Sequence, residues 1–220
     1  MILITIDLIV LFVAILTGFA VLRKKDPQHI VLFPYFLLLV LLVEYTSATI
    51  QKRHPGQSTV LLFNLFAAAE FAFFIYFFSR AMPNEKTKNI IRKTGYILPA
   101  ACLINAFFIQ GLYVFNTFTF MAGCLSMVIL SVIYYYQLFN QATDTNRLRE
   151  PSFWIITGII FFFVCTVSVM GAVNYISLLP AVVRENLHRI LLLVNAIFYL
   201  TFIIAFLCQI NIRKLSSSSS

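Results

Sequence analysis

The chain has 220 residues, of which 61% are hydrophobic and 11% charged, and its net charge is +8. Soluble domains carry about 25% charged residues, so this composition excludes a water-soluble fold and makes lipid the solvent for much of the apolar surface. The basic residues stand in short clusters between long apolar runs, which argues against a nucleic-acid-binding face and indicates membrane topology instead.

Seven apolar stretches follow one another along the chain, and each is long enough for a helix that crosses a bilayer, which takes about 20 residues. In chain order they cover about residues 2–22, 29–50, 58–79, 89–110, 112–139, 151–176 and 185–210. The sequence therefore predicts an all-α integral membrane protein in which residues 1–215 form one bundle of seven transmembrane helices. The serine run at residues 216–220 is expected to be a disordered or non-native tail.

Polar residues and helix-ending Pro or Gly separate most of these spans. Such breaks lie at residues 23–27, 51–56, 83–86 and 144–151. The fourth and fifth spans are separated only by Gln110 and Gly111, and Pro99 interrupts the fourth span. This pair is therefore the part of the predicted bundle that the sequence defines least sharply.

The Lys and Arg residues give the bundle a direction, because basic residues are retained on the cytoplasmic side of a membrane. With the N-terminus outside, the inner segments hold twelve of them and the outer segments four. The sequence therefore predicts an outer N-terminus and a cytoplasmic C-terminus, and we expect the protein in a bacterial inner (cytoplasmic) membrane. The inner residues are Arg23, Lys24, Lys25, Arg80, Lys86, Lys88, Arg92, Lys93, Arg147, Arg149, Arg213 and Lys214, and the outer ones are Lys52, Arg53, Arg184 and Arg189.

Three carboxylates, Asp7, Glu44 and Glu70, fall inside the predicted spans. Such a group costs about 2.5–3.5 kcal/mol at the centre of a membrane helix, so each is a candidate functional residue. At about 1.5 Å per residue, Asp7 and Glu44 lie roughly 9 Å inside the outer boundary and Glu70 about 18 Å inside, near the midplane. Asp7 either belongs to a site or reaches the lipid headgroups. Glu70 is either a protonated or hydrogen-bonded strut between helices or a group that binds a ligand or accepts a proton.

Arg189 is the natural partner of Glu44 or Asp7, unless its side chain extends to the outer headgroups. It lies on the seventh span beside a polar stripe that descends from the outer surface along one helix face. The residues of this stripe are His188, Asn195 and Tyr199.

Amides are also concentrated in the outer halves of the predicted spans, whereas the inner halves carry far fewer polar side chains. These amides are Asn64, Asn105, Asn116 and Asn174. The asymmetry predicts a polar cavity that opens outward and is closed inward, which is the shape of a receptor pocket rather than a channel. The ligand-binding residues predicted for it are Asp7, Glu44, Asn64, Glu70, His188, Arg189, Asn195 and Tyr199.

The residues that membrane cofactors need are missing. Retinal binding needs a Lys within a late span for the Schiff base, and the seventh span has none. A zinc hydrolase needs about three converging ligands, and His188 is the one histidine at membrane depth on the outer side. We therefore expect no metal, no cofactor and no catalytic residue, and a membrane enzyme that uses Glu44, Glu70 and His188 on a lipid is kept as an alternative.

Three segments carry a resemblance to known proteins, and they span residues 64–76, 151–158 and 195–199. Through them the chain resembles a family of small uncharacterised bacterial seven-transmembrane proteins and is similar to the membrane sensor modules that precede some histidine kinases. The resemblance covers nearly the whole chain and implies a seven-helix membrane fold with a signalling role. It supplies no functional residues to carry over.

The favoured hypothesis is a membrane-embedded sensor or receptor-like module that binds a small molecule or a lipid from the outer side and signals to a cytoplasmic protein partner. The basic inner loops would contact that partner or anionic membrane lipid, and no nucleic-acid partner is expected. One alternative is a small proton- or ion-coupled transporter that uses Glu70. Another is a structural membrane subunit of a larger complex.

Overall fold

The computed structural model describes residues 2–54, 56–112, 114–140, 147–173 and 180–218. Every regular element within these ranges is helical. The α-helices are α1 (Ile2–Val21), α2 (Gln28–Val31), α3 (Phe33–Arg53), α4 (Val60–Ala81), α5 (Glu85–Thr94), α6 (Ile97–Ile104), α7 (Thr117–Phe139), α8 (Pro151–Val173) and α9 (Ala181–Ser218), with a π-helical turn, η1 (Asn105–Ile109), after α6 and a 3₁₀ turn, η2 (Arg147–Arg149), before α8.

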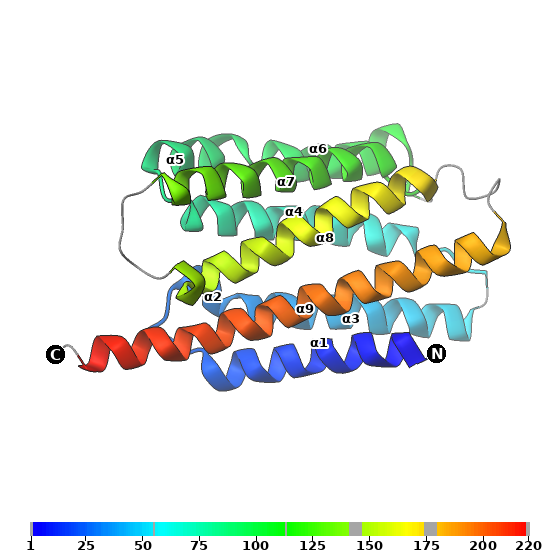
Figure 1. Cartoon of the computed structure of the whole chain (residues 1–220). Helices are drawn as coiled ribbons and strands as arrows, with labels where there is room; N and C mark the ends of the chain where they lie inside the picture. Colours follow the sequence, from blue (N-terminus) through cyan, green and yellow to red (C-terminus); the bar gives the residue numbers. More distant parts are fainter. Residues whose placement is uncertain (1, 55, 113, 141–146, 174–179, 219–220) are drawn as a thin grey trace.

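The long helices run along a common direction and form one bundle (Figure 1). Helix α9 packs against both α8 and α1, while α8 also contacts α7 and α1 contacts α3. The start of α1, the α3–α4 connection and the start of α7 lie at one end of the bundle, which we call the N-terminal end. The α1–α2, α4–α5 and α7–α8 connections lie at the opposite end with the C-terminus, which we call the C-terminal end. The chain thus alternates between the two ends.

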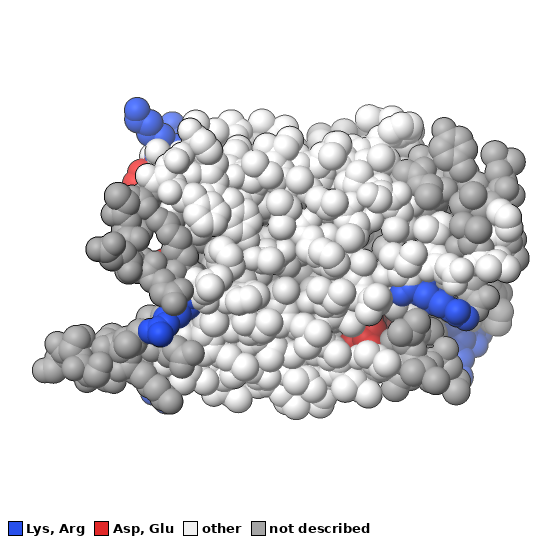
Figure 2. Space-filling view, in the orientation of Figure 1, with Lys and Arg blue, Asp and Glu red and all other residues white. Residues whose placement is uncertain are grey.

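Five helical segments are long and apolar enough to cross a membrane, as an integral membrane protein requires. They are Gln28–Arg53, Val60–Ala81, Thr117–Phe139, Pro151–Met170 and Arg189–Ile210. Helix α1 contributes a shorter apolar segment, Ile6–Val21, over the part whose side chains are described. Charged side chains agree with this reading, because Figure 2 shows Lys and Arg at the two ends of the visible face and an almost uncharged middle.

The fourth predicted span is not one continuous helix. Its first part is α5, a polar helix whose amino end is capped by the Asn84 side chain, which accepts a hydrogen bond of 2.8 Å from the Lys86 N–H. The chain then turns at Gly95, where a Cβ would collide with the Ile75 side chain of α4, and continues as α6 and η1. Pro99 lacks the N–H that would otherwise bond to the Gly95 carbonyl, so the break agrees with the interruption that Pro99 predicts.

Helix α9 extends to Ser218, and residues 219–220 lie outside the described ranges, so the nature of the serine run stays a prediction.

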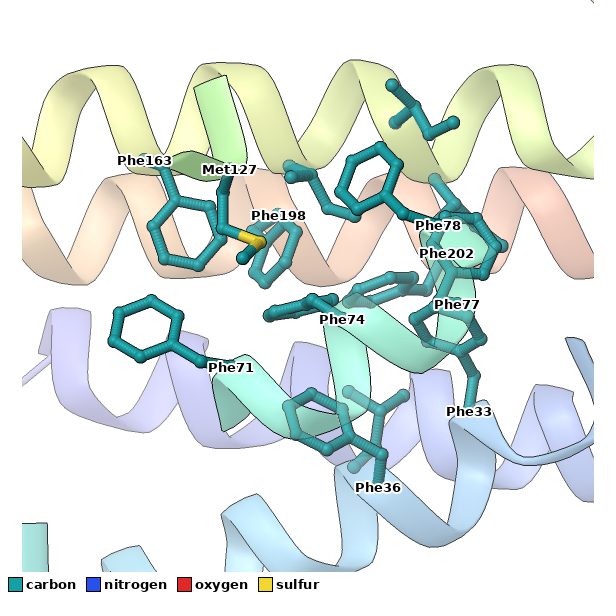
Figure 3. Close-up of a cluster of buried hydrophobic side chains, with 14 of the residues drawn as sticks. Phe33, Phe36, Phe71, Phe74, Phe77, Phe78, Met127, Phe163, Phe198 and Phe202 are labelled. Atoms are coloured by element: carbon teal, nitrogen blue, oxygen red, sulfur yellow. The ribbon is translucent and has the colours of Figure 1, made fainter. Parts of the chain in front are cut away.

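Aromatic rings fill the space between α3, α4, α8 and α9 (Figure 3). The ring of Phe33 in α3 has its centroid 5.1 Å from those of Phe77 in α4 and Phe202 in α9. Phe162 of α8 stacks on Phe198 of α9 at 4.5 Å. Such contacts join helices that are far apart in the sequence, and each aromatic pair adds about 0.5–1.5 kcal/mol beyond the area it buries.

Candidate ligand-binding pocket

A cavity of about 330 Å³ lies between α3, α4, α8 and α9, with the start of α7 along one side. Its walls are mainly phenylalanine rings, and five polar side chains interrupt them. These polar residues are Glu44, Glu70, Thr166, Asn195 and Tyr199. A few polar groups in an otherwise apolar cavity are typical of a small-molecule site, and sites of this type span about 300–1,000 Å³.

The cavity lies in the N-terminal half of the bundle. It uses the second half of α3, the first half of α4, the second half of α8 and the apolar residues of α9 that follow Arg189. All these parts face the end at which α1 begins (Figure 1). The predicted gathering of polar groups at one end of the bundle is therefore present in the structure, and the other half is filled by the aromatic core.

Glu70 is the most deeply placed acidic group of the pocket. It lies on the buried face of α4 with Ala67 one turn before it, and its side chain is 7% exposed. The small Ala67 side chain leaves the cavity open beside the carboxyl group. Within the described ranges this carboxyl group forms no hydrogen bond and no ion pair with another side chain. Glu70 is therefore not held by a hydrogen bond between helices, and the choice between a protonated strut and a ligand- or proton-binding group stays a prediction.

Glu44 and Tyr199 join α3 to α9 across the pocket. The Tyr199 hydroxyl donates to Glu44 Oε1 at 3.5 Å, which is at the long limit for a hydrogen bond. Tyr199 is buried, and the charges of Glu44, Asp7 and Glu70 all act on its phenol.

Asp7 lies behind this pair, on α1, and does not line the cavity. Its side chain is 3% exposed, and Oδ1 is buried without a hydrogen-bond partner. A buried carboxyl group cannot extend to lipid headgroups, so that interpretation of Asp7 is wrong. Its charge acts directly on Glu44.

Thr166 of α8 is a pocket residue that sequence reasoning missed. Its side chain is 3% exposed, and its hydroxyl is buried in the pocket wall without a partner. In the same helix, Thr157 and Ser168 donate their hydroxyls to the backbone carbonyl four residues earlier, at 2.8 and 3.0 Å. Thr166 lacks this local bond, and no pattern in an apolar run distinguishes such a hydroxyl beforehand.

Asn195 lies one turn before Tyr199 on α9. Both residues belong to the polar stripe predicted for this helix, and both line the cavity. Asn64, in contrast, is not a pocket residue. Its amide accepts from the Asn116 N–H and donates to the Val114 carbonyl, both at 3.0 Å, and so holds the segment before α7 against α4. This segment supplies Phe115 to the pocket wall, so Asn64 supports the site indirectly.

The remaining amides of the N-terminal end join the same network. Asn116 donates to the Cys102 carbonyl at 2.8 Å and accepts from Asn105, which also donates to Gln110 at 2.9 Å. These contacts fix the turn between η1 and α7. Their role in the described structure is to hold the backbone, not to face a ligand.

Arg189 does not line the cavity and is exposed. The ion pairs of the described residues do not include one between Arg189 and Glu44 or Asp7, so this pairing stays a prediction. The side chain of His188 and the whole of Asn174 lie outside the described residues.

The acids do not form a metal centre. In the part of the chain that the structure describes, no three His, Cys, Asp or Glu side chains are placed to hold one metal ion. What the arrangement offers instead is an apolar chamber with acidic and uncharged hydrogen-bonding groups in its wall. No protein-family model matches the chain, and neither a curated protein nor a solved structure shows significant similarity to it.

Proposed function

We propose that the protein is a membrane-embedded, receptor-like sensor that binds a small molecule or a lipid in this pocket. The observation that carries the proposal is a cavity whose wall holds Glu70, which forms no hydrogen bond among the described residues, and the buried, partnerless hydroxyl of Thr166. Buried polar groups without partners are costly, and a bound ligand that pairs with them removes this cost. Three segments that resemble sensor modules support the same reading.

The orientation is part of the proposal. Twelve of the sixteen Lys and Arg residues belong to the segments that an outer N-terminus places on the inner side. In this orientation the cavity would lie in the outer half of a bacterial inner membrane, where it would be open to ligands from outside. The aromatic core then closes the inner half, which favours a receptor over a channel.

Helix α9 is the element best placed to carry a signal. It begins beside the pocket, passes through the aromatic core at Phe202 and ends at the C-terminal end of the bundle. There the Gln209 amide donates to the buried Asp26 carboxylate at 3.1 Å, which ties α9 to the α1–α2 connection. A small ligand-driven shift of α9 would thus reach the cytoplasmic side, where a protein partner would respond.

A steric block tests the proposal without knowledge of the ligand. Ala67→Trp fills the cavity beside Glu70, whereas Ala69→Trp puts the same side chain on the exposed face of α4. Both variants and the wild type are purified in lipid nanodiscs, and bound molecules are identified by native mass spectrometry. We expect a specific bound species in the wild type and in Ala69→Trp that is missing in Ala67→Trp. Identical bound species in all three proteins would contradict a pocket ligand.

The partnerless carboxyl group of Glu70 also favours a second candidate, a small proton-coupled transporter. In that case substrate uptake into proteoliposomes would depend on a pH gradient and disappear in Glu70→Gln. The aromatic packing of Phe33, Phe77 and Phe202 stands between the pocket and the opposite end, so transport requires this core to open. A receptor requires no such opening, and we therefore rank it first.

A further inference from the structure

The charges in the pocket wall have one sign. Glu44 and Glu70 both line the cavity, and none of the described residues that line it is Lys, Arg or His. Asp7 adds a third acidic group behind Glu44. A carboxylate removed from water needs a positive partner, and here the described side chains provide none. A cationic group on a ligand would supply such a partner.

The apolar part of the wall also suits a positive charge. Phe36, Phe66, Phe162 and Phe198 line the cavity from α3, α4, α8 and α9. The faces of aromatic rings attract cations, and the attraction grows when the site excludes water. The same rings accommodate an apolar body, so an amphiphilic cation satisfies both parts of the wall.

The hydrogen-bond acceptors in the cavity wall indicate which kind of cationic head group the ligand carries. The carboxylate of Glu70 and the amide oxygen of Asn195 accept hydrogen bonds, and the Thr166 hydroxyl can accept as well. A primary ammonium group offers three donors and no acceptor. Its donors match these acceptors, whereas a quaternary ammonium would leave them without partners.

We propose that the pocket takes a primary amine with an apolar, aryl-sized body, bound as its cation. The ammonium group pairs with Glu70, Glu44 lines the same cavity, and the apolar body lies among the phenylalanine rings. This inference rests on the proposed function, because it assigns a ligand class to the same pocket. A fatty acid or another anion would meet the two carboxylates without a cation, and a neutral apolar lipid would leave Glu70 unpaired.

Three probes with one body test the charge. 4-Phenylbutylamine, 4-phenylbutanol and 4-phenylbutyrate carry a cationic, a neutral and an anionic head at neutral pH. Their binding is measured with radiolabelled probes and the full chain in phosphatidylcholine nanodiscs, with empty nanodiscs subtracted. The lipid is zwitterionic, so the bilayer surface does not attract the cation.

We expect the amine to bind the wild type at least about tenfold more tightly than the alcohol, since hydrogen bonds to charged groups are worth about 1.5–3 kcal/mol, and the butyrate to bind most weakly. Glu70→Gln, which keeps the side-chain size, should remove most of the preference for the amine. Glu44→Gln should reduce it, and Glu85→Gln, at an exposed site outside the pocket, should leave it unchanged.

Other outcomes overturn the inference in separable ways. If the alcohol or the butyrate binds the wild type as tightly as the amine, and Ala67→Trp removes that binding, the cation is wrong and the pocket stands. If the preference for the amine survives in both Glu70→Gln and Glu44→Gln, the ammonium does not bind here. If no probe binds the wild type, the inference fails, and the proposed function is still decided by the molecules that co-purify with it.

Discussion

Gly158 of α8 leaves space for the Thr201 hydroxyl of α9, because a Cβ at this glycine would collide with it. We expect Gly158→Ala to lower the free energy of unfolding by about 1–3 kcal/mol, as overpacking in a close-packed interior usually does. The measurement is an SDS-titration unfolding curve in mixed micelles.

A double variant shows whether the collision is the cause. Thr201→Ala removes the hydroxyl that the new methyl group would meet, so Gly158→Ala should cost less in that background than in the wild type. An equal loss in both backgrounds would mean that the glycine acts in some other way, such as through the backbone of α8.

The sequence predicts some of the pocket residues better than others. Glu44, Glu70, Asn195 and Tyr199 could be predicted, because a polar group in an apolar run is rare enough to stand out. Asn64 stands out equally, yet its partners are backbone groups about fifty residues later in the chain, at Val114 and Asn116. Sequence spacing identifies polar groups inside a membrane, but long-range contacts decide whether they face a ligand or the backbone.

Among the helices, the fourth predicted span is the one whose structure hydropathy predicted least well. The five strongest spans follow from apolar length alone. The segment between α4 and α7 instead joins the polar helix α5 to the apolar pair α6 and η1. The predicted span includes the second half of α5, although Arg92 and Lys93 separate Ile90 and Ile91 from the apolar run. Pro99 is the local sequence signal for the break between α5 and α6.

The first turn of α5 contains a charge pair that can be titrated. Lys88 Nζ lies 2.6 Å from Glu85 Oε1, and this hydrogen bond, with the charge of Lys88, lowers the pKa of Glu85 below its ordinary value. A lowered pKa means that the stabilisation is complete above the unfolded-state pKa and is lost as the pH falls through the folded-state pKa. We therefore expect the first turn of α5 to loosen only in acid, and the Glu85 carboxyl ¹³C shift to titrate at low pH.

Matched lysine variants separate the pair from the general charge of the helix. Lys88→Gln should raise the titration midpoint of Glu85, and Lys86→Gln should leave it nearly unchanged, since the charges that act on Glu85 are those of Lys88 and Arg92. Equal shifts in the two variants would show that the helix acts through its net charge and that the Lys88 contact contributes nothing specific.

For the whole molecule, the two halves of the bundle differ in character. The N-terminal half holds the cavity with its acids, and the buried aromatic core extends from the cavity wall at Phe36 and Phe198 to Phe33, Phe77 and Phe202 in the other half (Figure 3). A cavity at one end and tight packing at the other give the bundle a direction. Which side of the membrane the cavity faces then decides which molecules reach it.

The orientation of the bundle in the membrane can be measured by labelling single cysteines at three exposed positions in a cysteine-free background. Gln57→Cys lies in the α3–α4 connection, Val114→Cys lies just before α7 and Asn140→Cys directly follows α7. A membrane-impermeant maleimide is applied to intact spheroplasts. We expect it to label the first two positions, and to label Asn140→Cys only after lysis, because the basic residues predict an outer N-terminal end.

Each departure from this pattern has one meaning. Reversed labelling would turn the cavity towards the cytoplasm, and the ligand would then be an intracellular molecule. Labelling of Gln57→Cys and Asn140→Cys from outside, with Val114→Cys protected, would leave only α4 and α7 as membrane crossings between them. In that case α6 and η1 would not cross the bilayer, and six crossings would remain. The expected pattern requires α6 and η1, with α5 at their inner end, to complete a crossing despite the turn at Gly95.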